Sequence, residues 1–144
     1  MCGPLIEGAF VALMVAQACR LPFSYSEPRP AQGAGLFPVR YRIPAALRPE
    51  LRGRRVAVVN DVINAGSAVL GTLEDLRVCQ ARPVAIGALA VLGSAAAALA
   101  ATNGLPLVAL HELPNSIWTP RECPLCAVGT PLSTVEAAGE NRSE

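Results

Sequence analysis

The sequence contains no lysine, and all twelve of its basic residues are arginine. No lysine is therefore present to form a Schiff base or to act as a general acid. Charge of either sign is scarce, at 16% of residues, and the net charge is only +1. A protein that binds nucleic acid needs a basic field, which this composition does not supply. We interpret the arginine cluster before residue 56 as a solvated loop; it comprises Arg48, Arg52, Arg54 and Arg55.

Long hydrophobic runs and a cysteine framework are also missing. The apolar stretch Ala9 to Ala16 is too short to span a bilayer and follows Glu7 instead of a positively charged segment, so we expect neither a membrane span nor a secretion signal. The five cysteines are odd in number and scattered. They predict reduced thiols and a cytoplasmic protein.

The size and composition favour a single core. With 144 residues, of which 52% are hydrophobic, the chain can bury one substantial interior. We predict an α/β domain over residues 1–113 and a C-terminal tail over residues 114–144.

Hydrophobic runs and turn residues predict alternating strands and helices. Helices are expected at 9–19, 66–79 and 95–102, and strands at 23–26, 56–59, 84–92 and 106–110. Prolines and glycines in 27–35 argue against regular structure there, 36–43 reads as extended, and 44–53 as a connection. This order predicts a parallel-sheet, Rossmann-like core flanked by helices.

The most informative segment is Arg55 to Val69. Val56 to Val59 is an apolar run typical of a strand covered on both faces, and Asn60-Asp61 then brings polar groups to its carboxyl end, where α/β proteins bind ligands. Small residues follow at Asn64, Ala65, Gly66, Ser67 and Ala68. They permit close approach of a ligand to the backbone, and the next helix offers unpaired N–H groups to an anion. An ordinary strand–turn–helix without a ligand is the alternative.

This segment resembles the phosphoribosyl pyrophosphate (PRPP) signature of type I phosphoribosyltransferases. The resemblance implies that Asp61 lies by the ribose hydroxyls of PRPP, that Asn64 to Ala68 cradle its 5'-phosphate, and that Mg2+ accompanies the substrate. Asn60 replaces the first of the family's two acidic residues. An asparagine can hydrogen-bond a hydroxyl but brings no negative charge to a metal or to a cationic sugar.

Within the family, the chain looks most similar to the orotate branch. Gly3, Pro4, Leu5, Ile6, Glu7 and Gly8 match the position of its pyrophosphate loop, with Glu7 where that loop commonly has lysine. A glycine turn that only starts a helix is the alternative. The segment 27–36 matches the flexible catalytic loop, of which Arg29 would be the only cation and able to hold a phosphate. Gly93-Ser94 stands where orotate enzymes have an arginine for the base's carboxylate.

The resemblance also bears on the ends of the chain and its assembly. The family's N-terminal hood and most of its first strand are expected to be missing. Since family members usually dimerise, the resemblance implies a homodimer, with PRPP and a nitrogenous base as partners.

The tail carries Cys123-Pro-Leu-Cys126, whose spacing matches half of a zinc knuckle, and similar tails recur in some orotate phosphoribosyltransferase-like proteins. A structural zinc site needs four ligands, so His111 and another cysteine would have to join this pair, or a second subunit would have to supply the rest. Reduced structural thiols without metal are the alternative.

The sequence therefore supports two functional hypotheses. The first is an orotate-type phosphoribosyltransferase of pyrimidine nucleotide synthesis, with Asp61, Asn60 and Arg29 in catalysis. The second is a non-catalytic PRPP- or nucleotide-binding module, or a truncated inactive homologue.

Overall fold

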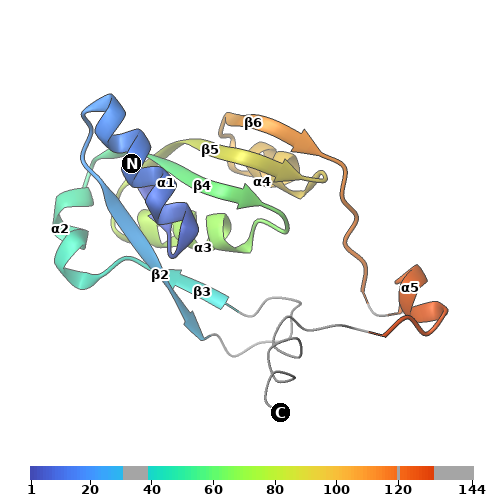
Figure 1. Ribbon diagram of the computed structural model, residues 1–144. Coiled ribbons are helices and arrows are strands. Elements are labelled where there is room, and N and C mark those ends of the chain that lie inside the picture. Colours follow the sequence, from blue (N-terminus) through green and yellow to red (C-terminus); the bar gives the residue numbers. More distant parts are fainter. Residues whose placement is uncertain (31–38, 120, 132–144) are drawn as a thin grey trace, which may run out of the picture.

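The computed structural model describes residues 1–30, 39–119 and 121–131 of the chain (Figure 1). They form a six-stranded sheet in the order β3-β2-β1-β4-β5-β6, parallel except for the antiparallel β2–β3 pair. The strands are β1 (Cys2–Pro4), β2 (Ser24–Pro30), β3 (Val39–Arg42), β4 (Arg55–Ile63), β5 (Arg82–Leu92) and β6 (Leu107–Leu113). The predicted parallel α/β fold is confirmed.

Helices cover the two faces of the sheet unequally. Helix α1 (Glu7–Cys19) packs on β1 and β4 from one side, while α3 (Ser67–Val78) and α4 (Ala95–Asn103) lie on the other (Figure 1). Each parallel crossover passes through one of these helices, as right-handed βαβ units require. Their boundaries agree with the sequence prediction to within a few residues.

The main core lies between the sheet and helices α3 and α4. Val58 and Ile86 from the sheet and Leu73 and Leu76 from α3 are fully buried there. A hydroxyl pair crosses this interior, since Ser26 Oγ and Thr72 Oγ1 lie 2.6 Å apart. The pair is satisfied within the core, so it does not compete with the apolar packing.

The predicted irregular segment 27–35 is wrong at its beginning. Strand β2 continues through Pro30 and pairs with β3, with Pro28 opposite Tyr41. Strand β1 pairs with β2 only as far as Ser26, so beyond that point β2 has a single neighbour. A proline is tolerated there because one side of the strand needs no N–H donor. Residues 31–35 lie outside the described residues.

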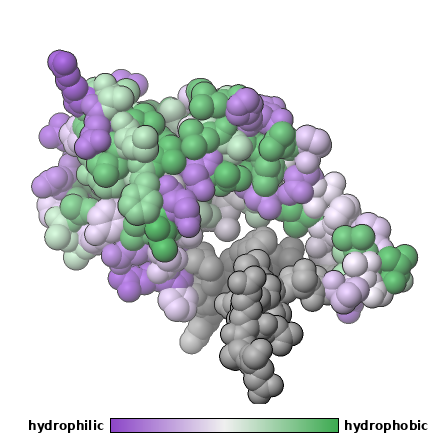
Figure 2. All heavy atoms as spheres, in the orientation of Figure 1, coloured by the Kyte–Doolittle hydropathy of each residue, from purple (hydrophilic) through white to green (hydrophobic). Residues whose placement is uncertain are grey.

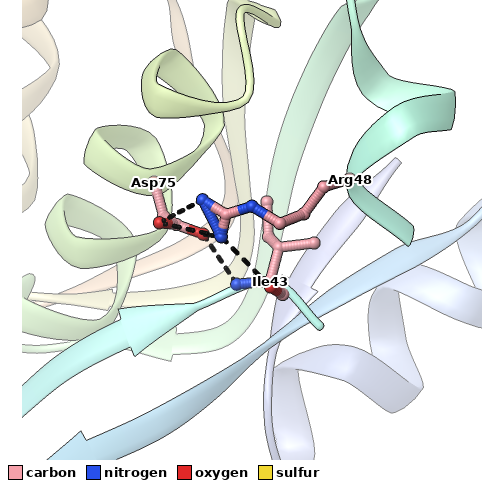
Figure 3. A network of polar contacts seen from close by, with 3 residues as sticks. All are labelled: Ile43, Arg48 and Asp75. Carbon is pink, nitrogen blue, oxygen red and sulfur yellow. Dashed lines mark hydrogen bonds and ion pairs between the residues drawn. The ribbon is translucent and has the colours of Figure 1, made fainter. Parts of the chain in front are cut away.

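The predicted connection 44–53 contains two short helical segments, η1 (Ala45–Leu47) and α2 (Arg48–Leu51). Arg48 is not the solvated loop residue that the sequence suggested. Its guanidinium contacts both carboxylate oxygens of Asp75 in α3, at 3.0 and 3.1 Å, and Asp75 also accepts the Ile43 N–H at 2.7 Å (Figure 3). This network ties the segment after β3 to α3.

No helix in the described part of the chain is both long and apolar enough to cross a bilayer.

Candidate functional site

A hollow of about 210 Å3 lies at the carboxyl end of β4, where it meets the start of α3. Its walls are Asn60, Val62 and the turn from Ile63 to Val69. The structure therefore places Asn60 and the predicted phosphate-binding residues Asn64, Ala65, Gly66, Ser67 and Ala68 around one small cavity.

Gly66 shapes the turn at the start of α3. It has φ +81° and ψ 2°, a left-handed conformation that favours glycine, and it caps the helix without any side-chain hydrogen bond. The first N–H groups of α3 have no partner within the helix. These donors and the positive end of the helix dipole favour an anion beside the turn.

Asn60 is an internal residue of β4, which extends to Ile63, and it is only 7% exposed. Its Nδ2 donates to the carbonyl oxygen of Val62 at 2.8 Å, and its Oδ1 lies against Gly8, where a β-carbon would clash. Asp61, the next residue of the strand, is partly exposed and is not among the described residues that line the hollow. The two polar residues of the motif therefore face different surroundings.

The predicted pyrophosphate loop is mostly regular structure. Gly3 and Pro4 belong to β1, Glu7 and Gly8 begin α1, and only Leu5 and Ile6 form the turn. A β-carbon on Gly3 would lie 2.5 Å from the carbonyl oxygen of Gly8. Packing therefore explains why both positions are glycine, because the absence of a side chain lets the first turn of α1 lie against β1 and β4. The Leu5 N–H donates to the Ser26 carbonyl at 2.8 Å, but the first turn of α1 lies beside Asn60 at Gly8, so the N–H groups at the start of this helix lie close to the hollow.

Tyr41 of β3, which does not line the hollow but borders a second cavity beside α3, is a residue that the sequence did not single out. Burial, together with the negative charge of Glu7, raises the pKa of its phenol. Its backbone and ring pack on α3 at Gly71, where an added β-carbon would lie 3.1 Å from the Tyr41 nitrogen. In the sequence, the only indication that this side chain faces the protein is its alternation with the arginines on either side.

Arg29, the predicted catalytic cation, does not line the hollow at Asn60. Its Nη2 pairs with Glu27 Oε2 at 2.6 Å within β2. It borders a separate open cavity of about 1100 Å3 between the β2–β3 hairpin and α3, together with Arg40, Arg42 and Arg48. Arg29 is thus separated from the predicted phosphate-binding residues, which line the hollow.

Asn115 is a second residue that the sequence did not single out. Its Nδ2 donates to Asn64 Oδ1 at 2.8 Å, which ties the segment after β6 to the candidate phosphate turn. Gly93, after β5, donates its N–H to the carbonyl of Leu113 at 2.8 Å and comes too close to Asn115 to accept a β-carbon. The sequence signal that could have identified it is a polar residue just past the last strand, because the carboxyl ends of parallel strands lie at the same edge of the sheet.

The two tail cysteines lie at the short helix α5 (Pro124–Ala127). The Cys126 N–H donates to Cys123 Sγ at 3.4 Å. Hydrogen bonds from the backbone N–H and thiol of Cys126 lower the pKa of Cys123. No group of three or more His, Cys, Asp or Glu side chains that could hold a metal occurs in residues 1–30, 39–119 and 121–131. His111 therefore does not complete a site with this pair.

Comparison with known proteins gives matches in sequence and in structure. No family model matches the chain. The orotate phosphoribosyltransferase of Heliobacterium modesticaldum is 29% identical over 129 residues, covering 90% of this chain and 61% of the relative. The chain thus spans about three fifths of that relative's length.

Solved structures match the fold. The crystal structure of the Aeropyrum pernix orotate phosphoribosyltransferase is 26% identical and superposes with a TM-score of 0.59, covering 78% of this chain and 59% of the other. The adenine phosphoribosyltransferase of Trypanosoma brucei, solved with AMP, pyrophosphate and ribose-5-phosphate, is 18% identical with a TM-score of 0.63, covering 95% and 65%. The chain is therefore related, in sequence and fold, to the type I phosphoribosyltransferases.

Proposed function

We propose that this chain binds PRPP at the β4–α3 turn and transfers its ribose 5-phosphate to a nitrogenous base, with release of pyrophosphate. The observation that carries the proposal is the hollow between the start of α3 and the buried Asn60. At that start Gly66 is the N-cap, and no side chain makes a capping hydrogen bond to the first N–H groups of the helix. The N–H groups of that first turn would hold the 5'-phosphate. The sequence similarity to orotate phosphoribosyltransferases makes orotate the first base to test.

The residues of this site divide the binding of PRPP between two turns. Asn64 to Ala68 would hold the 5'-phosphate, and the turn before α1 would face the diphosphate. Such a reaction needs positioning and charge stabilisation more than proton transfer, so the lack of lysine is compatible with it. Arg29 would have to move from its present pair with Glu27 to reach a leaving pyrophosphate.

An Mg2+ ion bound with PRPP would be held by the carboxylate of the β4 motif. Asp61 is partly exposed and would hold the ion with oxygens of PRPP, whereas the Asn60 amide is already engaged. Magnesium sites commonly combine one or two carboxylates with substrate phosphates. When bound, the ion would neutralise negative charge on the diphosphate.

Helix α1 provides the surface for a homodimer, which we propose as the working assembly. Its buried residues are the small ones, Gly8, Ala9, Ala12 and Ala16. Ile6, Phe10 and Met14, spaced four residues apart, are 60%, 60% and 68% exposed. Figure 2 shows apolar residues gathered over α1 and the strands beside it. A continuous apolar stripe of this kind marks a protein interface.

A thermal shift tests the binding site. At about one hundred times its Kd, PRPP with Mg2+ should raise the Tm by several degrees. Gly66→Val should abolish this rise, because valine disfavours φ +81° and its β-carbon would lie 3.0 Å from Leu99. Gly104→Val is the matched control: Gly104 also has positive φ, +63°, but nothing lies within 4 Å. It should lower the basal Tm yet keep the rise. Failure of PRPP to stabilise the unaltered chain would refute the proposal.

A second candidate function is a binding module without turnover. The observation that favours it is Asn60, a neutral amide hydrogen-bonded to the backbone in place of a free acid. Pyrophosphate release distinguishes the two functions. An enzyme releases pyrophosphate when PRPP is supplied with orotate or another base, whereas the module gives the thermal shift and no release across a panel of purines and pyrimidines.

A further inference from the structure

The Cys123–Cys126 turn has the backbone arrangement of a metal-binding knuckle. Cys123 is the N-cap of α5 and Pro124 its first residue, so the chain folds back on itself within four residues. The Cys126 N–H donates to Cys123 Sγ at 3.4 Å, and the Ala127 N–H donates to the Cys123 carbonyl at 3.0 Å. An N–H aimed at a sulfur fixes its orientation and offsets charge on the sulfur once a metal is bound.

The turn is closed on its far side by Gly129. This glycine has φ +69°, and its N–H donates to the Cys126 carbonyl at 3.1 Å. The Thr130 N–H then donates to the Leu125 carbonyl at 3.0 Å. Backbone hydrogen bonds therefore hold the two cysteines on one compact turn, and side-chain packing against the core is not needed for it.

The remaining nitrogen and sulfur ligands of the chain do not complete the site. Cys2 and Cys79 are buried in the main core, 0% and 8% exposed. Cys19 ends α1 and His111 lies on β6, and neither joins a group of three potential ligands in the described residues. The described part of one chain thus offers two thiolates to a metal that needs four ligands.

We propose that two copies of this chain share one Zn2+ ion, each contributing Cys123 and Cys126 to a tetrahedral four-sulfur site. Helix α5 stands apart from the sheet in Figure 1, and Cys126 is exposed, so a second copy can approach the turn. Soft thiolates in a closed tetrahedral set select zinc over magnesium or calcium. This inference does not rest on the proposed PRPP binding.

A metal titration of the full chain, kept reduced by a phosphine and freed of metal with a chelator, tests the proposal. Co2+ should produce the charge-transfer and visible bands of a tetrahedral four-thiolate site, with an endpoint of about 0.5 ion per chain. Zn2+ should displace the cobalt and remove the visible bands. In a sedimentation run on the Phe10→Glu variant, which we expect to be a monomer without metal, zinc should double the mass, and a chelator should reverse the change.

Three variants make the result specific. Cys123→Ser and Cys126→Ser should each remove the bands and weaken binding at least about 100-fold, since a hydroxyl is a poor ligand for zinc. Cys19→Ser, the matched control at an exposed cysteine outside the turn, should bind as the unaltered chain does. An endpoint of one ion per chain, absence of thiolate bands, or an unchanged mass of the Phe10→Glu variant would each overturn the shared site.

Discussion

Single residues far from the hollow determine the stability of this fold, and Asp75 is the clearest case. Its carboxylate is 9% exposed and accepts hydrogen bonds from the Ile43 N–H and the Arg48 guanidinium. Burying a carboxylate is favourable only while such partners are present. The residue therefore links three segments: the end of β3, α2 and α3.

Asp75→Ala should lower the free energy of unfolding by about 2–4 kcal/mol, because it leaves a buried N–H and a partly buried guanidinium without their acceptor. Urea denaturation measures this loss. Glu27→Ala, which removes the exposed pair with Arg29, is the control and should cost less than about 1 kcal/mol. Equal losses in the two variants would show that Asp75 is not a structural centre.

Cys2 gives the protein a pH-dependent stability. Burial raises the pKa of its thiol from 9.0 to about 11. Above pH 9 the unfolded chain loses this proton while the folded chain keeps it, so the free energy of unfolding should fall as pH rises from 9 to 11. The fall attributable to Cys2 is up to about 3 kcal/mol, at 1.36 kcal/mol per pKa unit. Cys2→Ala should flatten the profile measured by denaturation at each pH; an unchanged slope would contradict this cause.

At the scale of elements, the close approach of α3 to β3 depends on Gly71. A β-carbon at this position would lie 3.1 Å from the Tyr41 nitrogen and 3.2 Å from its Cβ. Helix propensity alone would make Gly71→Ala stabilising by about 1 kcal/mol. The tight backbone contact should reverse the sign, so that the variant is destabilised by about 1–2 kcal/mol.

Ala98→Gly in the exposed part of α4 is the counterpart of this exchange. It should cost about 1 kcal/mol through propensity alone. Thermal denaturation of both variants separates the two effects. If Gly71→Ala stabilises the protein while Ala98→Gly destabilises it, helix propensity decides the effect at Gly71. If both variants destabilise the protein, packing decides it.

The elements were more predictable than their contacts. The apolar run from Val56 and the turn at Gly66 are local signals, and they located β4 and the start of α3 from sequence. The contact of Gly8 with Asn60 and the pair of Arg48 with Asp75 join residues far apart in the chain. No local pattern encodes such pairs. The prolines of β2 led to a wrong prediction of irregular structure, because a proline is compatible with a strand only where one side of the strand has no neighbour.

For the whole molecule, the outward apolar side of α1 predicts self-association. A helix that buries glycine and alanine while it exposes Phe10 and Met14 leaves its larger hydrophobic area to water. Sedimentation of the metal-free protein at micromolar concentration should give the mass of two chains. Phe10→Glu should give a monomer, because a carboxylate would be buried without a partner in the interface.

The control for that experiment is Val108→Glu, which changes an exposed apolar residue of β6 away from α1. It should leave the mass unchanged. A monomer in the unaltered protein, or dissociation by both variants alike, would remove α1 from the interface. Because the metal is absent, the result does not depend on the tail cysteines.

Because Asn115 contacts Asn64, the ordering of the tail is thermodynamically coupled to the ordering of the phosphate turn. The chain leaves β6, passes Gly93, and reaches Asn64 before it continues toward the cysteines. Any event that orders residues 114–119 therefore also reduces the conformational freedom of the turn at Asn64. A phosphate that binds there would then lose less conformational entropy of the turn, so its affinity would rise. By reciprocity, a bound phosphate would favour the ordered tail by the same factor.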